Sequence, residues 1–102
     1  MAYDVGVGVP EDQAKAAAWF LKAAEQGSSW SQTNLAAAYH DGVGVPKDLV
    51  RAHMWWNLAA ASGDKNAAGN RQKAETQMTK EQVAEAEKLA REWYEAHRGA
   101  KP

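Results

Sequence analysis

The sequence predicts an all-α fold in which helical repeats stack side by side and a last helix closes the stack. One observation is an internal repeat: the heptapeptide at 42–48 (GVGVPKD) also stands at 6–12 (GVGVPED), 36 residues earlier, since 42 − 6 = 36. A second is composition, because alanine and other strong helix formers dominate and β-branched residues are few. Self-similarity at this period is typical of repeat proteins, in which each unit buries its apolar face against a neighbour.

The register of the repeat holds on both sides of the heptapeptide. Aromatic, small and glycine positions recur with the same offset: Tyr3 with Tyr39, Ala16 with Ala52, Trp19 with Trp55, Ala23-Ala24 with Ala59-Ala60, and Gly27 with Gly63. We therefore expect a single domain with a first copy over 3–38, truncated at its start, a second copy over 39–74, and a closing helix segment over 75–98.

The first helix is expected over Gln13–Gln26. Pro10 prevents an earlier helix from continuing, and Asp12 is a good N-cap residue. Residues 3–5 resemble the last turn of a helix whose earlier turns are missing. Apolar residues at i, i+3, i+4, i+7 and i+8 form one stripe along the first helix, namely Ala16, Trp19, Phe20, Ala23 and Ala24.

The second and third helices are expected over Trp30–Asp41 and Leu49–Ser62. Gly42 ends the second helix in the left-handed conformation, which glycine adopts without a Cβ clash. We expect the two helical hairpins to shelter each other's tryptophans, with Trp19 and Trp55 both in the core. The third helix carries the same kind of stripe as the first, formed by Ala52, Trp55, Trp56, Ala59 and Ala60.

A fourth helix over Lys65–Gln77 and a longer closing helix complete the chain. The segment Thr79–Gln82 (TKEQ) is a capping box, which predicts that the closing helix starts there. Apolar residues of the closing helix alternate spacings of three and four, and its other face is charged. Such a helix, apolar toward the array and charged toward water, suits the end of a repeat stack.

Composition and charge restrict the function classes. With 25% charged residues and a net charge of −1, the 102-residue chain has no basic field that would favour nucleic acid or an anionic membrane. No apolar run approaches the roughly 20 residues needed to cross a bilayer, so membrane insertion is not expected. The N-terminus lacks the regions of a secretory signal and the chain has no cysteine, which fits either the cytoplasm or the periplasm.

Motifs for catalysis, cofactors or metals are not evident. The GxG of each linker lacks the flanking strand, third glycine and Lys-Ser/Thr of a phosphate-binding loop, so we interpret it as a structural turn. The three histidines His40, His53 and His97 have no partner at ligand spacing, and His53 lies in a carboxylate-poor stretch. No nucleophile motif surrounds the serines. We therefore predict no catalytic, cofactor or metal site.

The recurring positions of the internal repeat, above all those of its central copy, resemble the repeat unit of the Sel-one-like repeat family. Two substitutions in the central copy, Ser31 and Ala36, are small-for-small, and Trp56 stands where tyrosine is usual. The segment 78–93 is similar to the closing segment common in bacterial members. The matching positions of the central copy are Ser31, Leu35, Ala36, Tyr39, Gly42, Gly44, Val45, Asp48, Arg51-Ala52, Trp55-Trp56, Ala59-Ala60 and Gly63.

The resemblance implies a tetratricopeptide-like α-α superhelix of antiparallel helix pairs with a C-terminal capping helix. Proteins of this kind usually serve as adaptors or scaffolds that hold other proteins, often in bacterial signalling, envelope or host-interaction assemblies. It thus implies a non-enzymatic protein–protein interaction module that needs no cofactor.

The same resemblance locates a partner-binding face, because the first helix of each pair lines the concave curve in tetratricopeptide-like folds. Trp30 is expected to face water, since its counterpart in the next copy is the polar Asn66, and an exposed tryptophan is a typical interface anchor. Leu35 and Tyr39 align the second helix with the first helix of a tetratricopeptide-like pair. This alignment places four residues of the second helix on the concave face: Trp30, Thr33, Ala37 and His40. The equivalent residues of the fourth helix are Asn66, Gly69, Lys73 and Thr76.

Two alternatives to the binding module remain open. Some members of the family have been linked to binding or hydrolysing β-lactam compounds, but those are rich in cysteine and this chain has none. The chain could instead be a purely structural end-cap of a longer repeat array.

Overall fold

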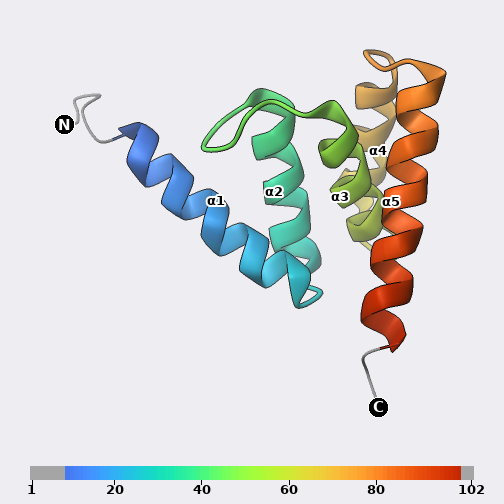
Figure 1. The fold of residues 1–102 in the computed structure, drawn as a ribbon, viewed down its shortest axis with the longest axis horizontal. Coiled ribbons are helices and arrows are strands. Elements are labelled where there is room, and N and C mark those ends of the chain that lie inside the picture. Colours follow the sequence, from blue (N-terminus) through green and yellow to red (C-terminus); the bar gives the residue numbers. More distant parts are fainter. Residues whose placement is uncertain (1–8, 100–102) are drawn as a thin grey trace.

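Five helices make up the described part of the chain, and they run in alternating directions (Figure 1). The computed structural model describes residues 9–99, with the side chains of residues 12–97. None of these residues forms a strand, so the predicted all-α repeat fold is confirmed. The helices are α1 (Val9–Glu25), α2 (Ser29–Asp41), α3 (Leu49–Ala61), α4 (Lys65–Glu75) and α5 (Lys80–Gly99).

Helix α3 is the centre of the core, because it packs against α2, α4 and α5. Its side chains are therefore buried on most sides, and Trp55 is only 3% exposed. The indole of Trp55 meets Trp93 of α5 edge-on, with ring centroids 5.6 Å apart. Ala52 and Ala59 are fully buried, and these small side chains let neighbouring helices approach closely. The stripe predicted for this helix is thus confirmed as core.

Side-chain caps begin α3 and α5, and the cap of α5 is the predicted capping box. Asp48 accepts a hydrogen bond from the Arg51 amide at the start of α3. The capping box before α5 is formed in both directions, because Thr79 and Gln82 each accept from the other's backbone amide. Gly42 ends α2 with φ of 71°, in the left-handed conformation. The caps account for why the predicted and observed ends of these helices agree closely.

The linker between α2 and α3 lies against α1, which explains the second glycine of the repeated heptapeptide. Gly44 has φ of 79°, and a Cβ atom there would overlap the carbonyl oxygen of Gln13 in α1. Glycine therefore serves two purposes at this position, a left-handed backbone and a close approach between linker and helix. The first copy of the linker, at 6–8, lies outside the described residues, as do residues 3–5.

The predicted start of the first helix is wrong. Helix α1 begins at Val9 and includes both Pro10 and Asp12, so Asp12 is not its N-cap. Proline is tolerated in the first turn of a helix because the amide it lacks has no intrahelical acceptor there. The proline therefore marks where this helix starts rather than where helical structure is blocked.

The predicted burial of Trp19 is also wrong, because its side chain is 73% exposed. Helix α1 packs on α2 and makes at most marginal contact with the other described helices. It does so through a stripe rotated from the predicted one, with Ala17 and Ala24 buried and Phe20 partly buried. On α3, the equivalent face carries Trp55 and is covered by α5. On α1, no described residue covers the face that carries Trp19. Figure 1 shows α1 leaning away from the rest of the stack.

A hydrogen bond joins the two first helices of the helix pairs, α2 and α4. The Thr33 hydroxyl donates to Asp64 Oδ2 at 2.6 Å, while Asp64 Oδ1 caps α4 by accepting from the amides of Asn66 and Ala67. The Thr33 bond, followed by these backbone bonds, holds the pKa of Asp64 below its ordinary value, against an opposing effect of desolvation. Asp64 is therefore both the cap of α4 and its tie to α2.

Replacing each of the two repeat-related tryptophans tests the burial difference between α3 and α1. Trp55→Ala is expected to lower the free energy of unfolding by about 3–5 kcal/mol, because it removes a buried indole from a well-packed core. Trp19→Ala, the control in the same repeat position, is expected to cost less than about 1 kcal/mol. Urea denaturation measures both values, and equal losses for the two variants would contradict the packing described.

The link between Thr33 and Asp64 predicts a pH-dependent loss of stability. A lowered carboxyl pKa stabilises the fold above the ordinary value of 3.8, and that contribution disappears as pH falls through the lowered pKa of the folded state. Thr33→Val should therefore raise the Asp64 pKa and cost about 1 kcal/mol near pH 7, but much less near pH 2. NMR titration of Asp64 and denaturation at both pH values test this. An unchanged Asp64 pKa in the variant would show that the hydroxyl is not responsible.

Candidate functional site

Trp30 stands out on the exposed side of α2. Its side chain is 67% exposed, which confirms the expectation that this position faces water. The indole meets the ring of Phe20 in α1 edge-on, with centroids 5.7 Å apart and an interplanar angle of 70°. This contact limits the conformations of an otherwise exposed side chain. Trp30 is thus a large apolar surface supported from one side by a neighbouring helix.

A groove of about 250 Å³ lies on the surface between α1 and α2, next to the contact of Trp30 with Phe20. Its walls are shallow because alanines from both helices face it, and Ala37 of the predicted partner-binding face lies among them. Val43 of the linker, 42% exposed, contributes a further apolar surface. The groove is lined by Gln13, Ala16, Ala17 and Phe20 of α1, by Asn34, Ala37, Ala38 and Asp41 of α2, and by Val43.

The other two predicted residues of α2 make contacts within the fold. Thr33 donates its hydroxyl to Asp64, as described above. His40 is partly buried: its Nδ1 lies 2.8 Å from Asp41 Oδ1, and its ring centroid lies 5.6 Å from that of Trp56. These contacts orient Thr33 and His40 toward α3 and α4, whereas Trp30 and Ala37 lie toward α1.

The residues predicted from α4 form a polar, exposed surface. Asn66 lies in the first turn of α4, where its amide bonds the same Asp64 that Thr33 contacts. Lys73 lies two turns further along and is exposed, and its carbonyl oxygen accepts a hydrogen bond from Thr76. The structure therefore connects Asn66 with Thr33 through Asp64, while Lys73 is separate from the apolar groove.

Sequence reasoning missed the contribution of α1 to this surface. The ring of Phe20 packs against Trp30. Asn34 and Asp41 line the groove, and they are separated by as many residues along α2 as Trp30 and Ala37 are. The spacing of Trp30, Asn34, Ala37 and Asp41 was a usable signal, since residues three and four apart share a helix face. The direction in which α1 packs was not readable, because alanines occupy most sides of that helix.

His53 has a partner that the local sequence does not show. Its buried ring places Nε2 at 2.7 Å from Glu75 Oε2, although the stretch of sequence around His53 is poor in carboxylates. Helix α4 supplies this carboxylate from 22 residues away. In the described part of the chain, no three His, Cys, Asp or Glu side chains gather as metal ligands would. None of the described helices is long and apolar enough to cross a bilayer.

Comparison with known proteins agrees with the helical repeat. The family model of the Sel1 repeat matches residues 1–28 and 31–64. The fold is similar to the crystal structure of c5321, a protective antigen present in uropathogenic Escherichia coli strains that displays an SLR fold, with a TM-score of 0.79 and 28% identity. The similarity covers 97% of this chain but 24% of that one, so this chain spans about a quarter of its relative. No curated protein matches the sequence.

Sel1 repeats are helical modules that generally mediate protein–protein interactions and are typically non-catalytic. The two matched ranges cover more than half of the sequence and include the 42–48 linker, α3, and all of α2 except its first two residues. They also contain every position of the central copy on which the resemblance was based, so the resemblance to the family is confirmed, while the closing segment 78–93 lies outside them. This chain belongs to the Sel1 repeat family.

Proposed function

We propose that this chain is a non-catalytic adaptor module that holds a protein or peptide segment on the exposed face of α2, in the groove that α2 forms with α1. The observation that carries the proposal is the exposed Trp30, which contacts Phe20, one of the residues that line this groove. The general use of Sel1 repeats in protein interaction supports it. Of the other predicted residues, Ala37 lines this groove, whereas Thr33, His40, Asn66 and Lys73 are proposed as a neighbouring polar part of the binding surface, on the side of α2 toward α3 and α4.

An indole in this position offers much binding energy at a low entropic cost. Tryptophan is enriched among the residues that dominate interface energetics, because it buries a large apolar area when a partner excludes water. Trp30 sits on a helix rather than a loop and already contacts Phe20, so little of its freedom remains to be lost on binding. These properties favour Trp30 as the anchor of the site.

The groove favours a partner segment with small or aliphatic side chains. Ala16, Ala17, Ala37 and Ala38 allow a backbone or a short side chain to come close to both helices. Asn34 and Asp41 provide polar groups beside this apolar strip, and Asn34 already donates to the Trp30 carbonyl oxygen. An apolar strip with polar groups beside it suits an amphipathic helix or an extended segment.

A second candidate function, a structural unit of a longer repeat array, is favoured by the uncovered face of α1. Ala16, Trp19 and Ala23 repeat the residues Ala52, Trp55 and Ala59, which other helices cover on α3. A helix of another repeat unit would bury the α1 face in the same manner. In that case Trp19, rather than Trp30, would carry the interaction.

Two matched variants separate these functions, since both tryptophans are exposed and neither substitution should unfold the chain. Proteins captured from the native host on the wild-type chain would be purified and titrated calorimetrically against wild type, Trp30→Ala and Trp19→Ala. We expect Trp30→Ala to weaken binding by at least about 2 kcal/mol, roughly thirtyfold, and Trp19→Ala by less than about 0.5 kcal/mol.

Circular dichroism would verify that both variants keep the wild-type helix content. Binding unaffected by Trp30→Ala would refute the proposed anchor. If Trp19→Ala alone abolished binding, the array function would replace the adaptor function.

A further inference from the structure

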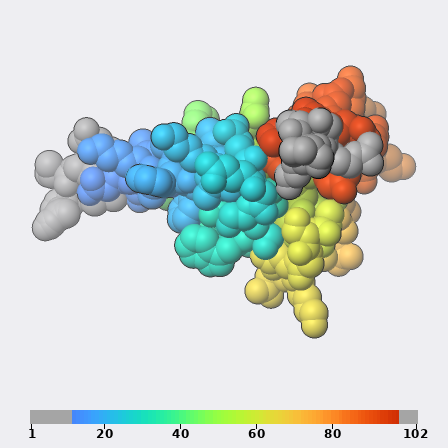
Figure 2. All heavy atoms as spheres, turned by 90° about the horizontal axis from the view of Figure 1, so that it is seen from below, coloured from blue at the N-terminus to red at the C-terminus, as the bar shows by residue number. Residues whose placement is uncertain are grey.

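A second cavity lies at the end of the molecule where α1, α3 and α5 terminate, and the residues that line it do not include the groove residues described above. Its volume is about 730 Å³, within the range of sites that hold small ligands or side chains. Figure 2 views the molecule from this end, where the α1–α2 turn, the α3–α4 turn and α5 border one another. The lining residues are Glu25, Gln26, Gly27, Gln32, Leu58, Ala61, Ser62, Trp93, Tyr94 and His97.

The charges around this cavity favour a cation. Glu25 contributes a carboxylate, and none of the described side chains that line the cavity belongs to lysine or arginine. Among its described side chains the lining therefore carries one carboxylate and no permanently charged basic group.

A buried acceptor without a partner adds to this preference. Gln32 is 1% exposed and lines the cavity, and its Nε2 donates to the Ala24 carbonyl oxygen at 3.0 Å. This bond fixes the orientation of the amide, since only the nitrogen can donate. Gln32 Oε1 is left with no hydrogen-bond partner, which costs free energy in a buried position. A ligand with N–H donors would satisfy it.

Aromatic side chains also line the cavity. Trp93 is held between Trp55, at 5.6 Å, and His97, which stacks on it with centroids 3.8 Å apart. Its indole Nε1–H is buried without a partner and can donate to a carbonyl oxygen. Tyr94 lines the cavity as well, and planar guanidinium groups pack well on such aromatic surfaces.

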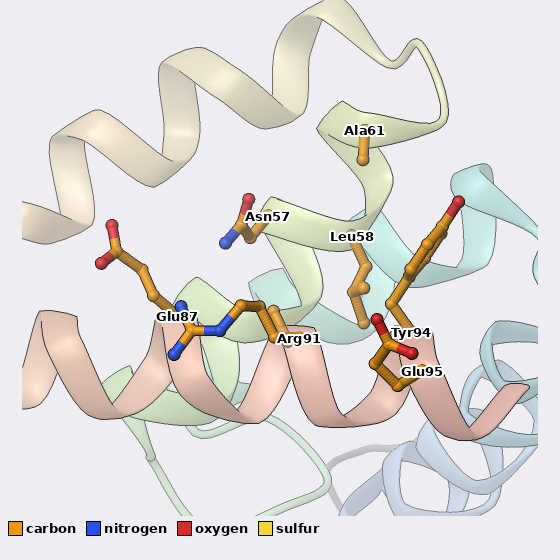
Figure 3. Close-up of a pocket in the computed structure, with 8 residues that line it drawn as sticks. Asn57, Leu58, Ala61, Glu87, Arg91, Tyr94 and Glu95 are labelled. Carbon is orange, nitrogen blue, oxygen red and sulfur yellow. The ribbon is translucent and has the colours of Figure 1, made fainter. Parts of the chain in front are cut away.

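The cavity continues into a neighbouring one of about 390 Å³ between α3 and α5. The two share Leu58, Ala61 and Tyr94, and Figure 3 shows Leu58 and Tyr94 beside each other, with Asn57, Glu87 and Arg91 further along. A single amino-acid side chain would fill only one of the cavities. A polypeptide could occupy both, with its backbone passing Tyr94.

We infer that this pair of cavities binds a peptide segment through an arginine side chain. The guanidinium lies between Glu25 and Gln32 Oε1, where a planar group with five N–H donors matches the available acceptors better than lysine does. The adjoining peptide carbonyl accepts from Trp93 Nε1, and the rest of the segment follows α5 past Tyr94. This site is separate from the Trp30 face, so each can fail without the other.

The test uses small probes and NMR observation of the Trp93 indole N–H. N-acetyl-arginine N-methylamide should shift this resonance saturably, whereas the citrulline analogue, of nearly equal shape but uncharged, should bind about tenfold more weakly. The pentapeptide acetyl-Ala-Ala-Arg-Ala-Ala-amide should bind more tightly than the single blocked residue, because it reaches the second cavity. The lysine analogue should be weaker than arginine.

Two variants at exposed positions locate the site. Glu25→Gln should weaken arginine binding about threefold to tenfold, and Ala61→Trp, which fills space shared by both cavities, should abolish it. Equal affinity for arginine and citrulline would overturn the cation preference. No saturable shift, or full affinity in Ala61→Trp, would overturn the site itself. A pentapeptide no tighter than the single residue would overturn the peptide as occupant.

Discussion

Enclosure of α3 by three other helices is the constraint on which the rest of the structure depends. Its tryptophans fill the space between α2, α4 and α5, and its alanines keep those helices close. A small domain has a narrow margin of stability, so one indole-rich helix at the centre accounts for much of it. The caps at Asp48 and Asp64 then fix where α3 and α4 begin, and thereby which residues reach the core.

The same residues behave differently in the two copies because burial depends on neighbours. Trp55 is covered by α5, whereas Trp19, its counterpart one repeat earlier, is exposed. Each repeat unit therefore carries an apolar helix face that a neighbouring helix can cover. Whether that face is buried depends on the helices that lie beside it in the array. The proposed binding face differs in kind, since Trp30 is exposed where the next copy has the polar Asn66.

The fold was largely predictable, because its signals are local or periodic. Asp48 in the second copy of the heptapeptide, the capping box at Thr79 and the left-handed Gly42 specify helix ends without knowledge of packing. The site was predictable only in part: exposure of Trp30 followed from comparison of the copies, but the contribution of Phe20 depends on the angle between α1 and α2. The His53–Glu75 pair and the unpartnered Gln32 depend on contacts distant in sequence, which periodicity does not reveal.

Solvent access to each of the five tryptophans tests the central claim most directly. In a chain labelled with 5-fluorotryptophan, single Trp→Phe variants would assign the five fluorine resonances, and a soluble gadolinium chelate would broaden those near water. Strong broadening is predicted for Trp19 and Trp30, and little for Trp55 and Trp56. Protection of Trp19 equal to that of Trp55, or broadening of Trp55, would contradict the account of α3 as the enclosed helix and α1 as the open one.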